Sequence, residues 1–328
     1  MNSTVNLTAI LGLNKNTDYG QKHKFSSVNN IKKFQQLPLM TRSTLDSFIR
    51  LQTNIGESDI LINGRPLAYL SDANGSLFMN TNAQMHQYNE LFKNIFEGQT
   101  TFLVAKYNSK KSQLTNDKCT ISNLSDAMLK NYFFNYRDQI QTNAKFSSSD
   151  ISYFKNISNK EHFTNLAKDA LKDKNITRIF AFDIKDLLYM FKIIEGIKPS
   201  ALKDIKKTWP KLKIVIGTNY ENNSAYYKKI KKIIGNVEFS NGIYLTEAGI
   251  LGASTDKPGI YEKVSDGNFY EIMDSKGKVF KLSQAKVGNT YTLIITNSAG
   301  LYRFVSNYKL EIVGNQNGKL TYKVLPSK

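Results

Sequence analysis

The middle of the chain carries the stretch that decides the fold, residues 208–252, which read TWPKLKIVIGTNYENNSAYYKKIKKIIGNVEFSNGIYLTEAGILG. The apolar run 212–216 predicts a buried strand, and a glycine turn follows it at 217–219. A basic helix is predicted over about 224–234, and a second apolar run predicts a strand over 242–245. Strand, helix and strand in this order indicate a βαβ unit, whose two strands end at the same edge of a parallel sheet.

Thr246 and Glu247 directly follow the second strand, at the sheet edge where ligands of open α/β folds bind. A hydroxyl and a carboxylate at this place suit a phosphate and its Mg²⁺ ion. The alternative is that Thr246 caps a helix that begins at Ala248. Spacing alone favours the cap, so the metal-site hypothesis depends on other parts of the chain.

Several sequence blocks resemble one enzyme family and occur in that family's order. The principal blocks are Trp209-Pro210-x-Leu212-Lys213, Gly217-Thr218-Asn219, Tyr244-x-Thr246-Glu247-x-Gly249 and Thr296-Asn297-x-Ala299-Gly300-Leu301-Tyr302-Arg303-Phe304. In these blocks the chain is similar to the Gretchen Hagen-type (auxin-responsive promoter) acyl acid–amido synthetases, which belong to the adenylate-forming enzymes. The resemblance implies a large domain that binds ATP, Mg²⁺ and a carboxylic acid, forms an acyl-adenylate and passes the acyl group to an amine.

The resemblance also implies the residues of the active site. Glu247 matches the family's Mg²⁺-binding glutamate and Thr246 is the hydroxyl beside it, so both are expected to be catalytic. The expected nucleotide-binding residues are Tyr244 on the adenine side, together with Gly217, Thr218, Ser71, Gly75, Ser76, Tyr302 and Arg303. A small-molecule acid or amine is the expected partner.

The first nucleotide motif departs from the family's pattern. Relatives carry a Ser-Ser-Gly-Thr-Thr-Gly type loop followed by a Lys, whose backbone N–H groups and hydroxyls hold the triphosphate. Here residues 68–80 read AYLSDANGSLFMN, without a Thr pair or a Lys. Asp72 adds negative charge where phosphates would lie, and the segment from Asp72 to Gly75 is typical of a turn between two strands. We expect this loop to bind phosphate weakly.

Two further elements of the family's ATP site are expected to be missing. Where relatives read Gly-Asp after the Leu-Tyr-Arg block, this chain has Asn307 and Tyr308, which removes the carboxylate that binds the ribose. A hydrogen bond to a charged group is worth about 1.5–3 kcal/mol, so this loss weakens binding about tenfold to a hundredfold. The chain ends at Lys328, so we also expect the small C-terminal domain and its lysine to be absent.

The rest of the chain predicts a mixed α/β fold. Helices are expected over residues 1–52, and helices alternate with strands from about residue 83 to 194. After Gly252 the pattern changes to short strands separated by glycine turns. We therefore expect a layered α/β large domain over residues 1–252 and a β-rich, barrel-like subdomain over residues 253–328.

The composition argues against several classes of function. Cys119 is the only cysteine, so an internal disulfide and a cysteine-based metal cluster are excluded, and the three histidines are not spaced as ligand pairs. The formal charge is +18, but only residues 228–232 (KKIKK) form a compact basic run, so a solvated basic surface is favoured over a nucleic-acid partner. No signal peptide or membrane-spanning run is evident, which predicts a cytoplasmic protein.

Three functions remain open. The favoured one is a degenerate synthetase-like protein that binds a small carboxylic acid, acyl conjugate, amine or protein partner, with weak or no ATP-dependent adenylation on its own. The second is an active amide-forming ligase with a rebuilt ATP site or a separate partner subunit, or an acyl transferase that uses a preactivated donor. The third is a polyanion binder driven by charge, which steep salt dependence of RNA binding would reveal.

Overall fold

The computed structural model describes residues 3–72, 74–105, 113–131, 145–146, 157–219, 224–255, 257, 259–263, 267–316 and 319–326. The predicted helices of the first 52 residues are confirmed: α1 (Ser3–Leu13), α2 (Asp18–Lys22), α3 (Ile31–Phe34) and α4 (Arg42–Arg50). Side chains cap these short helices; for example, the Thr41 hydroxyl accepts a hydrogen bond from the Thr44 N–H at the start of α4. Within the described residues, no helix is long and apolar enough to span a membrane.

A small sheet follows the N-terminal helices, with strand order β2-β1-β5-β4. Its strands are β1 (Ala68–Ser71), β2 (Leu77–Asn80), β4 (Gln113–Leu114) and β5 (Thr120–Ser122). Strands β1 and β2 form an antiparallel hairpin with Ser71 opposite Leu77. The predicted turn from Asp72 to Gly75 therefore connects two strands, and helix α5 (Asn82–Phe96) begins directly after the hairpin.

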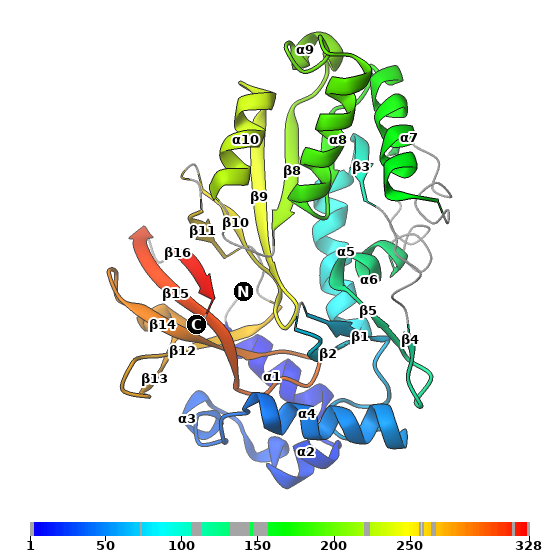
Figure 1. Ribbon diagram of the computed structural model, residues 1–328. Helices are drawn as coiled ribbons and strands as arrows, with labels where there is room; N and C mark the ends of the chain where they lie inside the picture. The colour runs from blue at the N-terminus through cyan, green and yellow to red at the C-terminus, as the bar shows by residue number, and fades with distance from the viewer. Residues whose placement is uncertain are drawn as a thin grey trace.

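Within the described residues the large sheet has twelve strands, and its parallel part contains the predicted βαβ unit (Figure 1). The parallel strands are β6 (Lys145–Phe146), β3 (Thr100–Val104), β7 (Arg178–Ala181), β8 (Ile214–Asn219) and β9 (Glu238–Leu245). Helices pack with them: α6 (Leu124–Asn131), α7 (Asn159–Lys172), α8 (Ile184–Ile197), α9 (Ile205–Thr208) and α10 (Ser224–Ile234). The pairing of β8 with β9 around α10 confirms the predicted unit, although β9 begins at Glu238 and not at residue 242. The predicted glycine turn at 217–219 is wrong, because these residues pair with β9 and form the end of β8.

The chain turns back after β9 and continues as antiparallel strands. These are β10 (Gly249–Ser254), β11 (Tyr261–Glu262), β12 (Phe269–Met273), β13 (Val279–Lys281), β14 (Thr290–Thr296), β15 (Phe304–Gln316) and β16 (Lys319–Pro326), with the short 3-10 helix η6 (Leu282–Gln284) after β13. Since β10 pairs with β9, the alternative of a helix beginning at Ala248 is wrong.

Two hydrophobic cores divide the molecule. One lies among the parallel strands and their helices, and the other joins the N-terminal helices to the antiparallel strands, which lie beside each other in Figure 1. Aromatic pairs bridge the second core: Phe34 contacts Phe269 edge-to-face at 5.5 Å, and Tyr19 stacks on Tyr302 at 5.2 Å between ring centroids. The cores thus do not follow the predicted boundary at residue 252, because the first helices pack with the last strands.

Candidate functional site

The turn between β9 and β10 holds Thr246 and Glu247 at the carboxyl end of the last parallel strand. Two buried asparagines fix its backbone from outside. Asn297 donates its side-chain amide to the carbonyl oxygen of Glu247 at 2.9 Å, and Asn268 donates to that of Ala248 at 2.6 Å. The Glu247 side chain is only 5% exposed, whereas Thr246 is half-buried. The position of Glu247 is therefore set by residues far away in the sequence.

The end of this turn requires glycine. Gly249 has a φ of +68°, which residues other than glycine rarely adopt. A Cβ atom at this position would lie 1.8 Å from the hydroxyl oxygen of Tyr88 in α5. Tyr88 is itself buried, so its ring has little room to move. Helix α5, the first helix after the β1–β2 hairpin, therefore packs closely against the turn that holds Glu247.

Burial raises the pKa of Glu247 from the usual 4.5 to about 7. The nearby Asp72 carboxylate raises it further, while the residue's own backbone N–H and the Arg42 guanidinium act in the opposite direction. Arg42 itself is held on the hairpin, because its guanidinium donates to the carbonyl of Leu77 at 3.3 Å and lies 4.5 Å from the Phe78 ring centre. At neutral pH, Glu247 is thus divided between its acid and its carboxylate form.

The β1–β2 turn, which was expected to be the phosphate loop, is closed by its own aspartate. One carboxylate oxygen of Asp72 accepts hydrogen bonds from the N–H groups of Asn74 at 2.9 Å and Ser76 at 2.8 Å. The Gly75 N–H donates to the Asp72 carbonyl at 3.1 Å, and the Asp72 N–H donates to the Ser76 carbonyl at 2.9 Å. The N–H groups of residues 72 and 74–76, which are the described backbone donors of this turn, are therefore already bonded within it.

The same turn occurs a second time in the molecule, between β12 and β13. There, one Asp274 oxygen accepts from the N–H groups of Lys276 and Lys278, both at 2.9 Å. Gly277 has a φ of +78°, against +77° for Gly75 in the first turn. The sequence pattern Asp-x-x-Gly-x thus gives one hairpin turn at two places, so the first turn has no special phosphate-binding geometry.

The other predicted nucleotide residues of the parallel sheet lie together. Gly217 and Thr218 lie near the end of β8, and Thr218 is paired with Gly242 of β9. A Cβ atom at Gly242 would lie 3.6 Å from the Thr218 methyl group and 3.9 Å from the Tyr244 ring, so these two side chains lie on the same side of Gly242. The Thr218 hydroxyl donates to the carbonyl of Phe182. Thr218 and Tyr244 are both buried.

Tyr302 and Arg303 lie in the second core instead. The Tyr302 hydroxyl donates to the carbonyl of Leu61 at 2.5 Å, and the ring is fully buried. The Arg303 guanidinium forms two hydrogen bonds with Glu271, at 3.0 and 3.3 Å, and donates to the carbonyls of Gln35 at 2.6 Å and Leu37 at 2.5 Å. Because these polar groups are used within the protein, we leave both residues out of the proposed site.

Two features indicate how well the site fits Mg-ATP. They are the residue at the position expected to bind the ribose and the side chains that could bind the metal ion. Tyr308 lies in β15 opposite Pro326, and its side chain offers no carboxylate. Among the described residues, no group of three His, Cys, Asp or Glu side chains could hold a metal ion. The Glu247 carboxylate could serve as a ligand of Mg²⁺, which accepts one or two carboxylates when phosphates complete its shell. The closed turn at Asp72 does not fit a triphosphate.

Four residues of the site were missed by the sequence reasoning: Arg42, Tyr88, Asn268 and Asn297. Asn297 lies in a block that resembles the family, but its bond to the Glu247 carbonyl spans 50 positions. The remaining three come from α4, α5 and the start of β12, and nothing in their local sequence marks them. Only the folded chain brings them to Glu247.

Family models describe most of the chain. The GH3 family N-terminal domain matches residues 4–207, and the GH3 family central domain matches residues 256–319. The chain belongs to the GH3 family. The expected resemblance to adenylate-forming acyl acid–amido synthetases is thereby confirmed. A comparison with curated proteins finds no match.

Solved structures share the fold of this GH3 chain at low sequence identity. A GH3.15 acyl acid amido synthetase is 17% identical with a TM-score of 0.76, and AtGH3.15 in complex with 2,4-DB is 16% identical with a TM-score of 0.78. The alignments cover 99% of this chain and 67% of each of those chains. A 2-hydroxyisobutyryl-CoA ligase in complex with R3-HIB-AMP is 10% identical, with a TM-score of 0.66 and coverages of 99% and 66%. The mixed α/β fold is thus that of about two thirds of such a synthetase.

Proposed function

We propose that this GH3-family chain binds a small carboxylic acid or its acyl conjugate and binds Mg-ATP only weakly, so that these 328 residues alone adenylate slowly or not at all. The observation that carries the proposal is the closed β1–β2 turn. The N–H groups of Asn74 and Ser76 are bonded to the Asp72 side chain, and that side chain adds a negative charge beside Glu247. A triphosphate would have to displace these bonds and approach two acidic groups.

Calorimetric titration with Mg-ATP tests the proposal on the wild type and on two variants of the turn. Asp72→Asn removes the charge but keeps an acceptor for the turn, whereas Asp72→Gly also frees the two N–H groups. We expect no measurable binding below millimolar Mg-ATP for the wild type. Asp72→Gly should tighten binding by about tenfold or more, with Asp72→Asn between the two.

Asp274→Gly is the matched control, because it opens the equivalent turn between β12 and β13. It should leave the affinity for Mg-ATP unchanged. Binding of Mg-ATP to the wild type in the low micromolar range, or equal effects of opening the two turns, would contradict the proposal.

One observation favours the second candidate, an active ATP-dependent ligase. Glu247 and Thr246 remain at the carboxyl end of β9, where the family resemblance places a Mg²⁺ ligand and its neighbour. Pyrophosphate release, measured with a panel of carboxylic acids and amines, distinguishes the two candidates. Release by the wild type that Glu247→Gln lowers about a hundredfold would favour the ligase, since metal charge stabilisation is worth several kcal/mol. Absence of release in both proteins would support the binding function.

A further inference from the structure

Lysines gather at the end of the parallel sheet where β7, β8 and β9 begin, which is the upper end in Figure 1, beside α9. Three segments form this end, and we call them the basic end: residues 168–178, 195–213 and 228–238. They contain fourteen Lys or Arg and five Asp or Glu residues, a net charge of +9. Half of the chain's charge of +18 therefore lies in 41 of its 328 residues.

Hydrogen bonds join the three segments of the basic end. The Lys213 N–H donates to the carbonyl of Thr177 at 2.8 Å, and the Glu238 N–H donates to the carbonyl of Lys213 at 3.3 Å. The Lys174 ammonium donates to the carbonyl of Thr208 at 2.9 Å. The sequence shows only one compact basic run, and it is the tertiary structure that brings the lysines of the other two segments beside it.

Most of the positive charges at the basic end have no negative partner. Among the described residues, no ion pair involves a residue of this end. Three of its lysines donate to backbone carbonyl groups, which are uncharged. Lys203, Lys207 and Lys213 are exposed, and their ammonium groups make no described hydrogen bond or ion pair. These charges are free to meet an anionic partner.

The remaining side chains of the basic end favour a phosphate backbone as that partner. The structure describes every residue of this end, and Ile197 is its one exposed large apolar side chain. A protein interface or a membrane anchor needs a larger apolar area. Trp209, the single aromatic residue here, is fully buried, so unpaired bases have no exposed ring on which to stack. A second copy of this chain is opposed by its own charge of +18.

We infer that the basic end binds the phosphate backbone of double-stranded nucleic acid without preference for sequence. A duplex presents phosphates at high density, and lysine binds a phosphate as a point charge. Each contact releases condensed counterions, so the affinity must fall steeply as salt is added. Glu247 follows the opposite, carboxyl end of β9, so the inference goes beyond the proposed function and does not depend on it.

Fluorescence anisotropy with a labelled duplex of about 20 base pairs tests the inference on the full chain. At about 50 mM salt we expect micromolar binding, which weakens by at least about tenfold at about 200 mM salt. Duplexes of different sequence should bind equally, because phosphate contacts carry no sequence information. A single strand of the same length should bind more weakly.

The triple variant Lys203→Gln/Lys207→Gln/Lys213→Gln removes three exposed charges from the basic end. We expect it to weaken duplex binding by at least about tenfold. It should also lower the slope of log affinity against log salt by about 2–3, since each phosphate contact contributes about 0.9 to that slope. The melting temperature should stay at the wild-type value, because these ammonium groups make no described contact.

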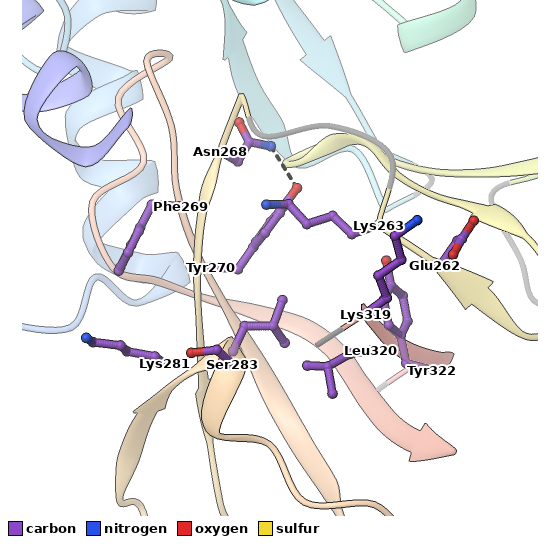
Figure 2. Close-up of a pocket in the computed structure, with 11 residues that line it drawn as sticks. Glu262, Lys263, Asn268, Phe269, Tyr270, Lys281, Ser283, Lys319, Leu320 and Tyr322 are labelled. Carbon is purple, nitrogen blue, oxygen red and sulfur yellow. Dashed lines mark hydrogen bonds between the residues drawn. The ribbon is translucent and has the colours of Figure 1, made fainter. Parts of the chain in front are cut away.

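The matched control is Lys276→Gln/Lys281→Gln/Lys319→Gln, which removes the same charge from the antiparallel strands. Figure 2 shows Lys281 and Lys319 at a pocket there, and Lys276 is exposed in the turn between β12 and β13. This variant should leave the affinity for the duplex and the salt slope nearly unchanged. Equal losses in the two triple variants would overturn the inference. Binding of the wild type to phosphatidylserine vesicles or to polyglutamate, without binding to the duplex, would overturn it as well.

Discussion

Two turns meet at Glu247, and they are held in opposite ways. The β1–β2 turn is held by hydrogen bonds within the turn. Asp72 takes part in each of those described above, through its side chain or its backbone. The β9–β10 turn is held from outside, by the amides of Asn268 and Asn297 and by the packing of Tyr88 against Gly249. The described N–H groups of the β1–β2 turn are already bonded within it, whereas the β9–β10 turn, which is held by its neighbours, keeps an acidic side chain buried.

The largest expected difference between the turns comes from adding a methyl group to their glycines. Gly249→Ala would meet the Tyr88 ring as well as the penalty of a positive φ, so we expect the free energy of unfolding to fall by roughly 3–5 kcal/mol. Gly75→Ala has a φ of +77° but open space around it, and should cost only about 1 kcal/mol. Urea denaturation measures both values. Equal losses would show that the Tyr88 contact does not restrain the β9–β10 turn.

The second prediction concerns pH, because only the β9–β10 turn buries its carboxyl group. With the pKa of Glu247 raised to about 7, the folded chain keeps a proton that the unfolded chain has lost above pH 4.5. Stability must therefore fall as the pH rises from 4.5 to about 7, by roughly 3 kcal/mol in total, and then stay level with respect to this group.

Glu247→Gln removes this titration and should flatten that part of the stability curve, measured by urea denaturation at several pH values. Asp186, whose pKa burial also raises to about 7, gives a background slope that Glu247→Gln leaves in place. The stability of the double variant Glu247→Gln/Asp186→Asn should depend even less on pH. A curve unchanged by Glu247→Gln would mean that the carboxyl group is solvated.

The third prediction compares the hydrogen bonds that hold the turns. Asn297→Ala leaves the buried carbonyl of Glu247 and the N–H groups of Ala299 and Leu301 without their partner, so we expect a loss of about 2–3 kcal/mol. Asp72→Ala uncovers N–H groups that water can reach, and should cost about 1 kcal/mol. Thermal or urea denaturation of the two variants provides the measurement. A larger loss for Asp72→Ala would reverse the comparison.

The smallest expected effect tests the electrostatic link between the turns. Asp72 raises the pKa of Glu247, so Asp72→Asn should lower it slightly, and the fall in stability should end at a lower pH than in the wild type. Asp274→Asn, in the distant copy of the turn, should leave that pH unchanged. If both variants shift the pH dependence of stability equally, the shift is caused by the change in net charge and not by the distance of Asp72 from Glu247.

Much of the fold could be predicted because it depends on local patterns. The apolar runs of β8 and β9 with a basic helix between them are typical of a βαβ unit. The structure differs from the prediction in the start of β9 and at residues 217–219, which end β8 and do not form a turn. The parallel strands contain apolar stretches in which every residue is buried, such as 102–104 and 179–181, and such stretches are easily recognised. The helix alternative at Ala248 failed because pairing of β10 with β9 outweighs the capping preference of Thr246.

The sequence by itself determined the turns, as Asp72 and Asp274 demonstrate: the same pattern produces the same bonds at both places, because every partner lies within four positions. Only the tertiary structure decided what each turn does. Arg303 was expected at a nucleotide, yet it bonds to Gln35, 268 positions away, and so joins the N-terminal helices to the last strands. Glu247 owes its raised pKa to burial within the folded chain and to Asp72 of the β1–β2 turn, 175 positions earlier in the sequence, and such long-range effects leave no trace in the local sequence.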